Sequence, residues 1–195
     1  EKVMLGPERK SRILTEREKE ITAYHEAGHA IVAHFQLHTD PVHKISIIAR
    51  GQAGGYTLKL PIADKHMHTK TEFIEELAVL LAGYITEQEI FGDITTGATS
   101  DLRRATKLAR KLITDYGMSE GLGPRTFGQK EEMIFLGREI HEQRDYSEKI
   151  AEQIDKEISQ FIEHAVHQAK GIIGQQKEKM EKVVAVLMEK ETLER

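Results

Sequence analysis

Apolar residues recur at intervals of three or four positions over most of the chain, which predicts amphipathic helices. The first three predicted helices cover about residues 15–37, 70–91 and 100–117. The first two each begin with a capping box, a threonine followed three positions later by a glutamate. A long fourth helix begins near Ser147, and Gly171 and Gly174 are expected to interrupt it before a last C-terminal helix.

Two short segments favour strands instead. Residues 44–50 are rich in β-branched side chains, and residues 55–61 alternate apolar and polar positions. The glycine-rich segment 51–55 is typical of a turn or of a sheet edge approached by another backbone. The whole pattern predicts a mainly α fold, a helical domain with a small two- to three-stranded β-sheet and a C-terminal helical hairpin or bundle.

The composition restricts the chemistry that such a domain can use. The chain has 195 residues, with no cysteine, 10 histidines and a formal net charge of −4. Without cysteine there is no disulfide scaffold, Cys-ligated zinc, iron–sulfur cluster or thiol nucleophile, so any metal is expected on His, Asp or Glu. The near-neutral charge argues against a nucleic-acid partner. No apolar run approaches the roughly 18 residues of a membrane span.

His25, Glu26 and His29 form an H-E-x-x-H motif within the first predicted helix. Positions four apart lie nearly above one another on a helix, so both imidazoles can converge on one metal ion. Glu26 is rotated by about 100° from His25, so its carboxylate can reach a metal-bound water without binding the metal. The motif predicts one Zn2+ ion, with Glu26 as the catalytic general base. The plainer interpretation is an amphipathic helix with these side chains at its surface.

The third ligand does not come from this helix. An extended motif with a third downstream histidine would need Gly at position 32 and His at position 35, where the chain has Val32 and Phe35. His34 and His38 are out of phase with the metal-binding face. His43 is predicted in a loop, where helical phase does not apply.

Carboxylates are the remaining candidates for the third ligand. Glu87 lies on the second predicted helix, and Asp101 lies at the start of the third. A carboxylate at a helix N-terminus often serves only as a cap. Spacing alone therefore leaves the choice between Glu87 and Asp101 open.

Further segments accompany the motif in a specific order along essentially the whole chain. They are VMLGPERK at 3–10, EREK at 16–19, AYHEAGHA at 23–30, ISII at 45–48, RGQA at 50–53, GYT at 55–57, LAG at 81–83, TGATSDL at 96–102, YGMS at 116–119, LGP at 122–124 and FLG at 135–137. In these segments the sequence resembles the peptidase domain of the FtsH family of membrane-anchored, ATP-dependent zinc proteases. The resemblance implies that Asp101 is the third zinc ligand beside His25 and His29, and that Glu26 is the catalytic base.

The resemblance also implies a domain organisation. Residues 1–14 are expected to be a connector from an absent upstream ATPase domain, and residues 15–195 to be the zinc metallopeptidase domain. Within that domain, 15–146 form the catalytic part and 147–195 the C-terminal helices. The sequence contains no P-loop motif, so ATP is expected only in the absent upstream domain.

The partners implied by the resemblance are polypeptide substrates and further copies of the chain in a hexameric ring. The full-length protein is expected at the cytoplasmic face of the inner membrane, held there by absent N-terminal segments, whereas this fragment is expected to be soluble. The function is expected to be hydrolysis of unfolded polypeptides in protein quality control. The alternative is a non-catalytic, ring-forming assembly module with a structural metal site.

The glycine-rich segment and its strand are candidates for binding substrate. An extended peptide can add to an exposed sheet edge through main-chain hydrogen bonds. The candidate residues are Gly54, Gly55, Tyr56 and Thr57. An ordinary hairpin turn is an equally simple interpretation of the same residues.

Overall fold

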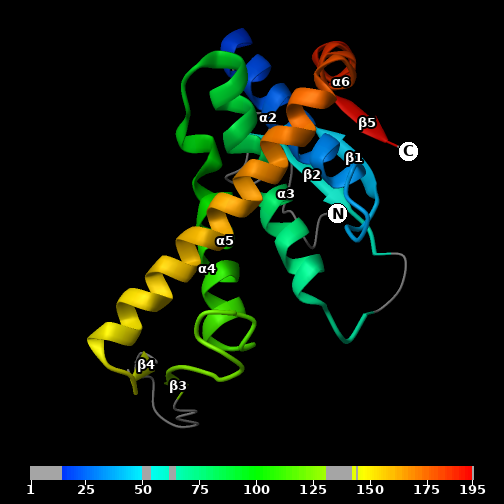
Figure 1. Cartoon of the computed structure of the whole chain (residues 1–195). Helices are drawn as coiled ribbons and strands as arrows, with labels where there is room; N and C mark the ends of the chain where they lie inside the picture. The colour runs from blue at the N-terminus through cyan, green and yellow to red at the C-terminus, as the bar shows by residue number, and fades with distance from the viewer. Residues whose placement is uncertain (1–14, 50–53, 62–64, 131–141, 144, 195) are drawn as a thin grey trace, which may run out of the picture.

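Figure 1 shows the fold in a computed structural model that describes residues 15–49, 54–61, 65–130, 142–143 and 145–194. Five α-helices form most of this described part: α2 (Glu16–His34), α3 (Lys70–Phe91), α4 (Thr99–Thr114), α5 (Glu148–Gln175) and α6 (Lys177–Lys190). The predicted mainly α fold is confirmed, and the first three helices lie within three residues of their predicted bounds. The predicted connector 1–14 and most of the segment 51–55 lie outside the described residues.

The two predicted capping boxes begin helices α2 and α3. The hydroxyl of Thr15 accepts a hydrogen bond from the backbone N–H of Glu18, whose carboxylate accepts one from the backbone N–H of Thr15. Thr69 and Glu72 repeat this arrangement at α3, which ends at Gly92 in the left-handed conformation, at φ 68°. Local sequence therefore determines where both helices begin.

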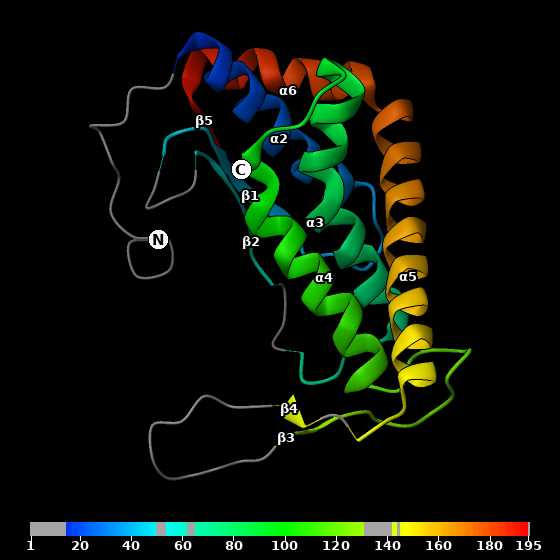
Figure 2. The same cartoon turned by 90° about the vertical axis from the view of Figure 1, so that its left-hand side faces the viewer.

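Helix α3 lies at the centre of the domain. It contacts α2, α4 and α5, and α6 packs against α2 (Figure 2). Helix α2 buries several alanines, among them Ala23, Ala27 and Ala30, which let neighbouring backbones approach closely. The largest fully buried apolar side chains are Leu77, Ile85, Leu112, Ile113, Ile154, Met180, Leu187 and Val32. In the described residues, no helix is both long enough and apolar enough to cross a membrane.

The predicted interruption at Gly171 and Gly174 is wrong. Helix α5 continues through both glycines to Gln175, and the break comes at Gln176, which ends α5 and begins α6. A glycine inside a helix costs about 1 kcal/mol relative to alanine. Burial of Ile173 between the two glycines offsets this cost, so the helix continues.

A small antiparallel sheet lies beside α2, with the strand order β2-β1-β5. Its strands are β1 (Val42–Ser46), β2 (Tyr56–Lys59) and β5 (Thr192–Glu194). The sheet has three strands, the upper of the two predicted numbers, because the C-terminal strand β5 pairs with β1 (Figure 1). Strand β1 begins and ends earlier than the predicted range 44–50. The remaining short elements are a 3-10 turn, η1 (Thr96–Ala98), and the paired strands β3 (Gln129–Lys130) and β4 (Glu142–Gln143).

Candidate metal centre

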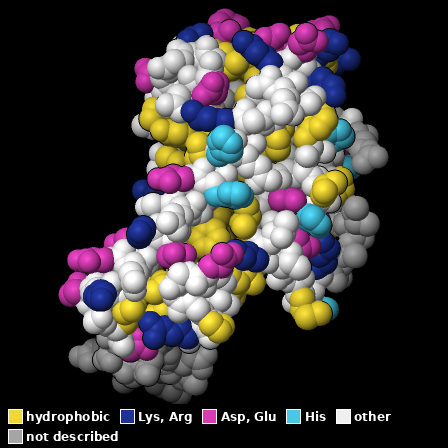
Figure 3. All heavy atoms as spheres, in the orientation of Figure 1, with side chains coloured by type: hydrophobic (Ala, Val, Ile, Leu, Met, Phe, Trp, Pro, Cys, Tyr) yellow, Lys and Arg dark blue, Asp and Glu magenta, His cyan; other side chains and the backbone are white. Residues whose placement is uncertain are grey.

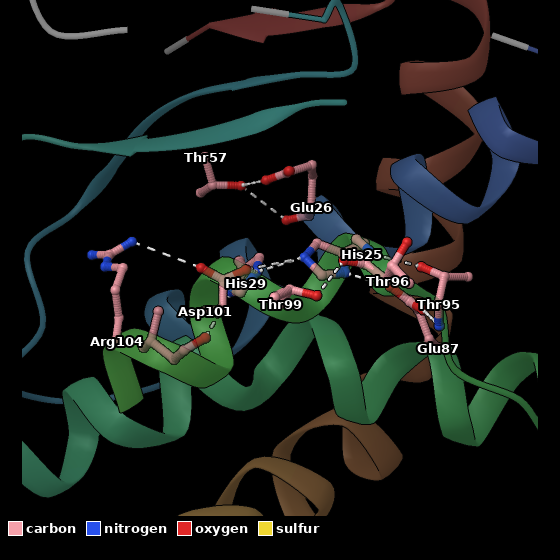
Figure 4. Close-up of polar contacts among 12 residues, drawn as sticks. His25, Glu26, His29, Thr57, Glu87, Thr95, Thr96, Thr99, Asp101 and Arg104 are labelled. Carbon is pink, nitrogen blue, oxygen red and sulfur yellow. Dashed lines mark hydrogen bonds and ion pairs between the residues drawn. The ribbon is translucent and has the colours of Figure 1, made fainter. Parts of the chain in front are cut away.

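The residues of the H-E-x-x-H motif lie in the buried part of α2. His25, Glu26 and His29 are all buried, although each carries a polar or ionisable side chain. In Figure 4 the two imidazoles are directed toward Asp101, whereas the Glu26 carboxylate is directed toward Thr57. The helix thus presents the histidine pair on one side and the glutamate on another. The interpretation of the motif as a set of surface side chains is excluded.

Three donor atoms converge at the start of α4. Nε2 of His25 lies 3.1 Å from Nε2 of His29, and Oδ2 of Asp101 lies 3.4 Å and 3.5 Å from these two nitrogens. Zinc bonds of about 2.0–2.1 Å in tetrahedral geometry place neighbouring ligand atoms about 3.3 Å apart. The three distances are close to that value. The spacing of these donors therefore fits a zinc ion, which would activate a water molecule if bound there.

The outer nitrogens of both imidazoles have acceptors. Nδ1 of His29 donates to the carbonyl oxygen of Val79 at 2.7 Å, and Nδ1 of His25 donates to Oε1 of Glu87 at 2.7 Å. A carbonyl or a carboxylate can only accept, so each Nδ1 carries a proton and each Nε2 is the atom available to a metal. Outer partners of this kind fix the orientation of ligating histidines. Glu87 thus contacts His25 from the side opposite Asp101.

The electrostatics of the cluster favour a positive charge at its centre. Burial lowers the pKa of His25, but the carboxylates of Asp101 and Glu87 outweigh burial and raise that pKa to about 10. Burial raises the pKa of Asp101, but its contacts with His25 and His29 outweigh burial and hold that pKa well below its usual range. Burial raises the pKa of Glu87, but its hydrogen bonds with His25 and with the backbone N–H of Thr95 outweigh burial and lower that pKa. A proton or a metal ion between these groups therefore stabilises the cluster.

The turn before α4 positions both carboxylates. The backbone N–H of Thr95 donates to Oε2 of Glu87 at 2.6 Å, and the Thr95 hydroxyl accepts from the backbone N–H of Gly97 at 3.1 Å. The chain then passes through η1 into α4, whose first turn contains Asp101. Arg104, one turn further on, places its guanidinium 3.7 Å from Oδ1 of Asp101. The segment from Thr95 to Asp101 therefore contacts Glu87 at one end and supplies the central carboxylate at the other.

Helices α2 and α3 are in close contact, and a glycine on α3 leaves room for the His25 ring between them. A Cβ added to Gly83 on α3 would overlap the imidazole of His25. A Cβ added to Gly28 on α2 would overlap the side chain of Thr86. The sequence pattern did not reveal that Gly83 contacts the site. A glycine within a helix and without a helix-ending role is the signal that points to such a contact.

The start of strand β2 lies against Glu26. The Thr57 hydroxyl is 2.8 Å from Oε2 of Glu26 and 3.1 Å from the carbonyl oxygen of the same residue. A Cβ on Gly55 would come within 2.9 Å of Cγ of Glu26. Tyr56 is buried, and a Cβ on Gly54 would meet Thr22 rather than Glu26. Of the four predicted substrate-binding residues, Gly55 and Thr57 thus lie against Glu26.

The histidines excluded by helical phase lie away from the cluster. His34 is exposed, and Nδ1 of His38 is 2.8 Å from Oε1 of Glu75. His43, which phase did not exclude, is 3.7 Å from Glu194 on strand β5. Figure 3 shows histidine side chains at the molecular surface. In the described residues, the cluster that could hold a metal ion is formed by His25, His29 and Asp101.

Two histidines and a carboxylate that converge beside a buried glutamate of an H-E-x-x-H motif define the class of zinc metallopeptidases. Comparison with known proteins narrows this class. The sequence profile of peptidase family M41 matches residues 12–195. The chain therefore belongs to peptidase family M41, a family of zinc metalloproteases.

Individual relatives agree with this assignment. The chain is 53% identical over 194 residues to the ATP-dependent zinc metalloprotease FtsH 1 of Sphaerobacter thermophilus, a match that covers 100% of this chain and 30% of the relative. It is 50% identical over 192 residues to the ATP-dependent zinc metalloprotease FtsH of Caldicellulosiruptor bescii, covering 98% of this chain and 31% of the relative. The resemblance to FtsH proteases is confirmed, and the chain spans about 30% of the length of these curated relatives.

Proposed function

We propose that this chain hydrolyses peptide bonds in unfolded polypeptides, using a Zn2+ ion held by His25, His29 and Asp101. The observation that carries the proposal is the convergence of one donor atom from each of these residues within 4.8 Å. Bound zinc lowers the pKa of its water to about 7 and polarises a carbonyl group. Family membership and the chemistry of the donors support the same metal.

Glu26 is the general base in this proposal. Glu26 follows His25 directly on α2. Its carboxylate is directed toward strand β2 rather than toward the three donor atoms. A carboxylate placed beside the open position can accept a proton from the attacking water and later deliver it to the leaving amine. Glu87, on the far side of His25, orients that imidazole instead of holding the metal.

The edge of strand β2 is the proposed binding site for the substrate backbone. In the described part of the sheet, β2 pairs with β1 on one side only. An extended peptide added to the other side would lie beside Gly54, Gly55, Tyr56 and Thr57, close to Glu26. Main-chain pairing of this kind requires little side-chain specificity, which suits the degradation of diverse unfolded chains.

The larger assembly is also part of the proposal. The relatives are named ATP-dependent proteases, and this chain corresponds to about 30% of their length. We infer that ATP is used by an upstream domain, connected through residues 1–14 to the peptidase domain 15–195. The resemblance to FtsH supports a hexameric ring at the cytoplasmic face of the inner membrane, with quality control of proteins as its role.

The variant Glu26→Gln tests the proposed function. We expect it to retain zinc, because Glu26 is not a ligand, and to lose peptide hydrolysis by about 10²- to 10⁴-fold, the usual contribution of a general base. Zinc content and casein hydrolysis are measured on the same preparation. Glu20→Gln, on the same helix but away from the cluster, is the matched control. Retained hydrolysis in Glu26→Gln would refute the role of Glu26 as general base. Zinc binding without hydrolysis in the unaltered protein would favour a structural metal site in an assembly module.

A further inference from the structure

The carboxylate of Glu26 is held by a side chain that belongs to the sheet. Thr57, on strand β2, donates its hydroxyl proton to Oε2 of Glu26 at 2.8 Å (Figure 4). The hydroxyl of Thr57 therefore contacts the Glu26 carboxylate directly. The contact joins residues 31 positions apart, so it exists only because β2 packs over α2.

The same hydroxyl has a second acceptor. The carbonyl oxygen of Glu26 lies 3.1 Å from Oγ1 of Thr57, slightly further than the carboxylate oxygen. A hydroxyl has one proton, so Thr57 spans the main chain and the side chain of one residue. A hydroxyl placed beside the main-chain carbonyl of Glu26 favours the side-chain rotamer in which Oε2 of Glu26 also faces β2.

Gly55 restricts Glu26 from a second direction. A Cβ on Gly55 would come within 2.9 Å of Cγ of Glu26 and within 2.7 Å of the carbonyl oxygen of Ser46. The stem of Glu26 therefore packs directly against the backbone at the start of β2. Strand β2 thus limits the stem by contact and the carboxylate by a hydrogen bond.

From these contacts we propose that Thr57 is a positioning residue, which holds the Glu26 carboxylate beside the metal cluster for proton transfer. The proposal rests on the proposed role of Glu26 as general base. It gives the Thr57 side chain a role distinct from substrate binding, which would use the main chain of the same strand. A misplacement of a reacting group by about 1 Å can reduce a rate about 100-fold, so the hydrogen bond affects kcat.

The variants Thr57→Val and Thr57→Ser separate the hydroxyl from the rest of the side chain. Valine keeps the shape of threonine without the hydroxyl, and serine keeps the hydroxyl. With zinc-loaded protein and a fluorogenic peptide, we expect Thr57→Val to lower kcat by about 10- to 100-fold, with KM unchanged within about twofold. Thr57→Ser is expected to restore most of kcat. Thr106→Val, at an exposed threonine on α4, is the control for the substitution itself.

Three kinetic outcomes would overturn the proposal. They are a kcat of Thr57→Val within twofold of the unaltered protein, an equal loss in Thr57→Ser, and a rise in KM in place of the fall in kcat. The last of these would assign the side chain to substrate binding. Loss of zinc from Thr57→Val would also overturn it, since a structural role would then explain the lower rate.

Crystal structures of the two variants provide a readout that does not depend on activity. We expect the Glu26 carboxylate to leave its position in Thr57→Val and to keep its contact with the hydroxyl in Thr57→Ser. An unchanged carboxylate in Thr57→Val would refute the positioning role. The proposed function fails separately, if Glu26→Gln hydrolyses peptides as fast as the unaltered protein, whatever the position of Glu26 in these structures.

Discussion

Nδ1 of His25 lies 2.7 Å from Oε1 of Glu87, while Nε2 of the same ring faces Oδ2 of Asp101 at 3.4 Å. The His25 ring thus lies between Glu87 and Asp101, the two carboxylates that the spacing in the sequence left as candidates for the third metal ligand. Only Asp101 also lies near Nε2 of His29, at 3.5 Å. The two carboxylates therefore have different environments, and their replacement should have different effects.

Asp101→Ala should weaken zinc binding more than Glu87→Ala does. Asp101→Ala removes a donor atom from the cluster. Glu87→Ala removes only the outer partner of His25, and a change of that kind lowers metal affinity by about 10- to 100-fold. Competition against a chelator of known affinity measures both. Glu89→Ala, at an exposed position on α3 two residues from Glu87, is the control. The opposite ranking would show that Glu87 is the ligand.

Gly83→Ala should disrupt the site through packing alone. The added methyl group would overlap the His25 ring, so the ring or helix α3 must move, and we expect zinc affinity to fall at least tenfold. Gly171→Ala is the matched control, because nothing lies within 4 Å of a Cβ at that helical glycine. That control should raise the free energy of unfolding by about 0.5–1 kcal/mol. Normal zinc affinity in Gly83→Ala would contradict the close contact between α2 and α3.

The metal-free protein should lose stability as the pH rises above neutral. Folding raises the pKa of His25 from 6.5 to about 10. A group with a raised pKa contributes its full stabilisation below the unfolded value, and this contribution is lost as the pH rises through the folded value. Thermal unfolding of chelator-treated protein should therefore show Tm falling between about pH 7 and pH 10. The variant His25→Gln should show a smaller fall in Tm over this range. An identical pH dependence of Tm in both proteins would refute the titration of His25 as its cause.

Thr69→Ala should destabilise the fold without affecting the site. Thr69 caps helix α3 and accepts from the backbone N–H of Glu72 at 3.2 Å. Loss of such a cap costs about 1 kcal/mol, which corresponds to a fall in Tm of about 2–4 °C for a domain of this size. Thr106→Ala, at an exposed position within α4, should leave Tm nearly unchanged. A change in zinc content with Thr69→Ala would show that the cap affects the metal cluster.

Local signals explain which parts of the fold could be predicted. The capping boxes at Thr15 and Thr69 act within one helical turn, so they determine helix starts without help from distant residues. The three-residue strand β5 gave no such signal, because its structure depends on pairing with β1, far away in the sequence. Gly171 and Gly174 misled the prediction for the opposite reason, since burial of Ile173 outweighed a correct local preference.

The sequence by itself determined the helix that carries the H-E-x-x-H motif, and the relative directions of His25, Glu26 and His29 on it. These directions follow from the helical repeat, which is a property of consecutive residues. Tertiary structure alone decided which nitrogen of His25 each carboxylate faces, that Gly83 makes room for the ring, and that Thr57 holds Glu26. Those contacts join residues separated by 31 to 76 positions, so they depend on how α3, α4 and β2 pack around α2.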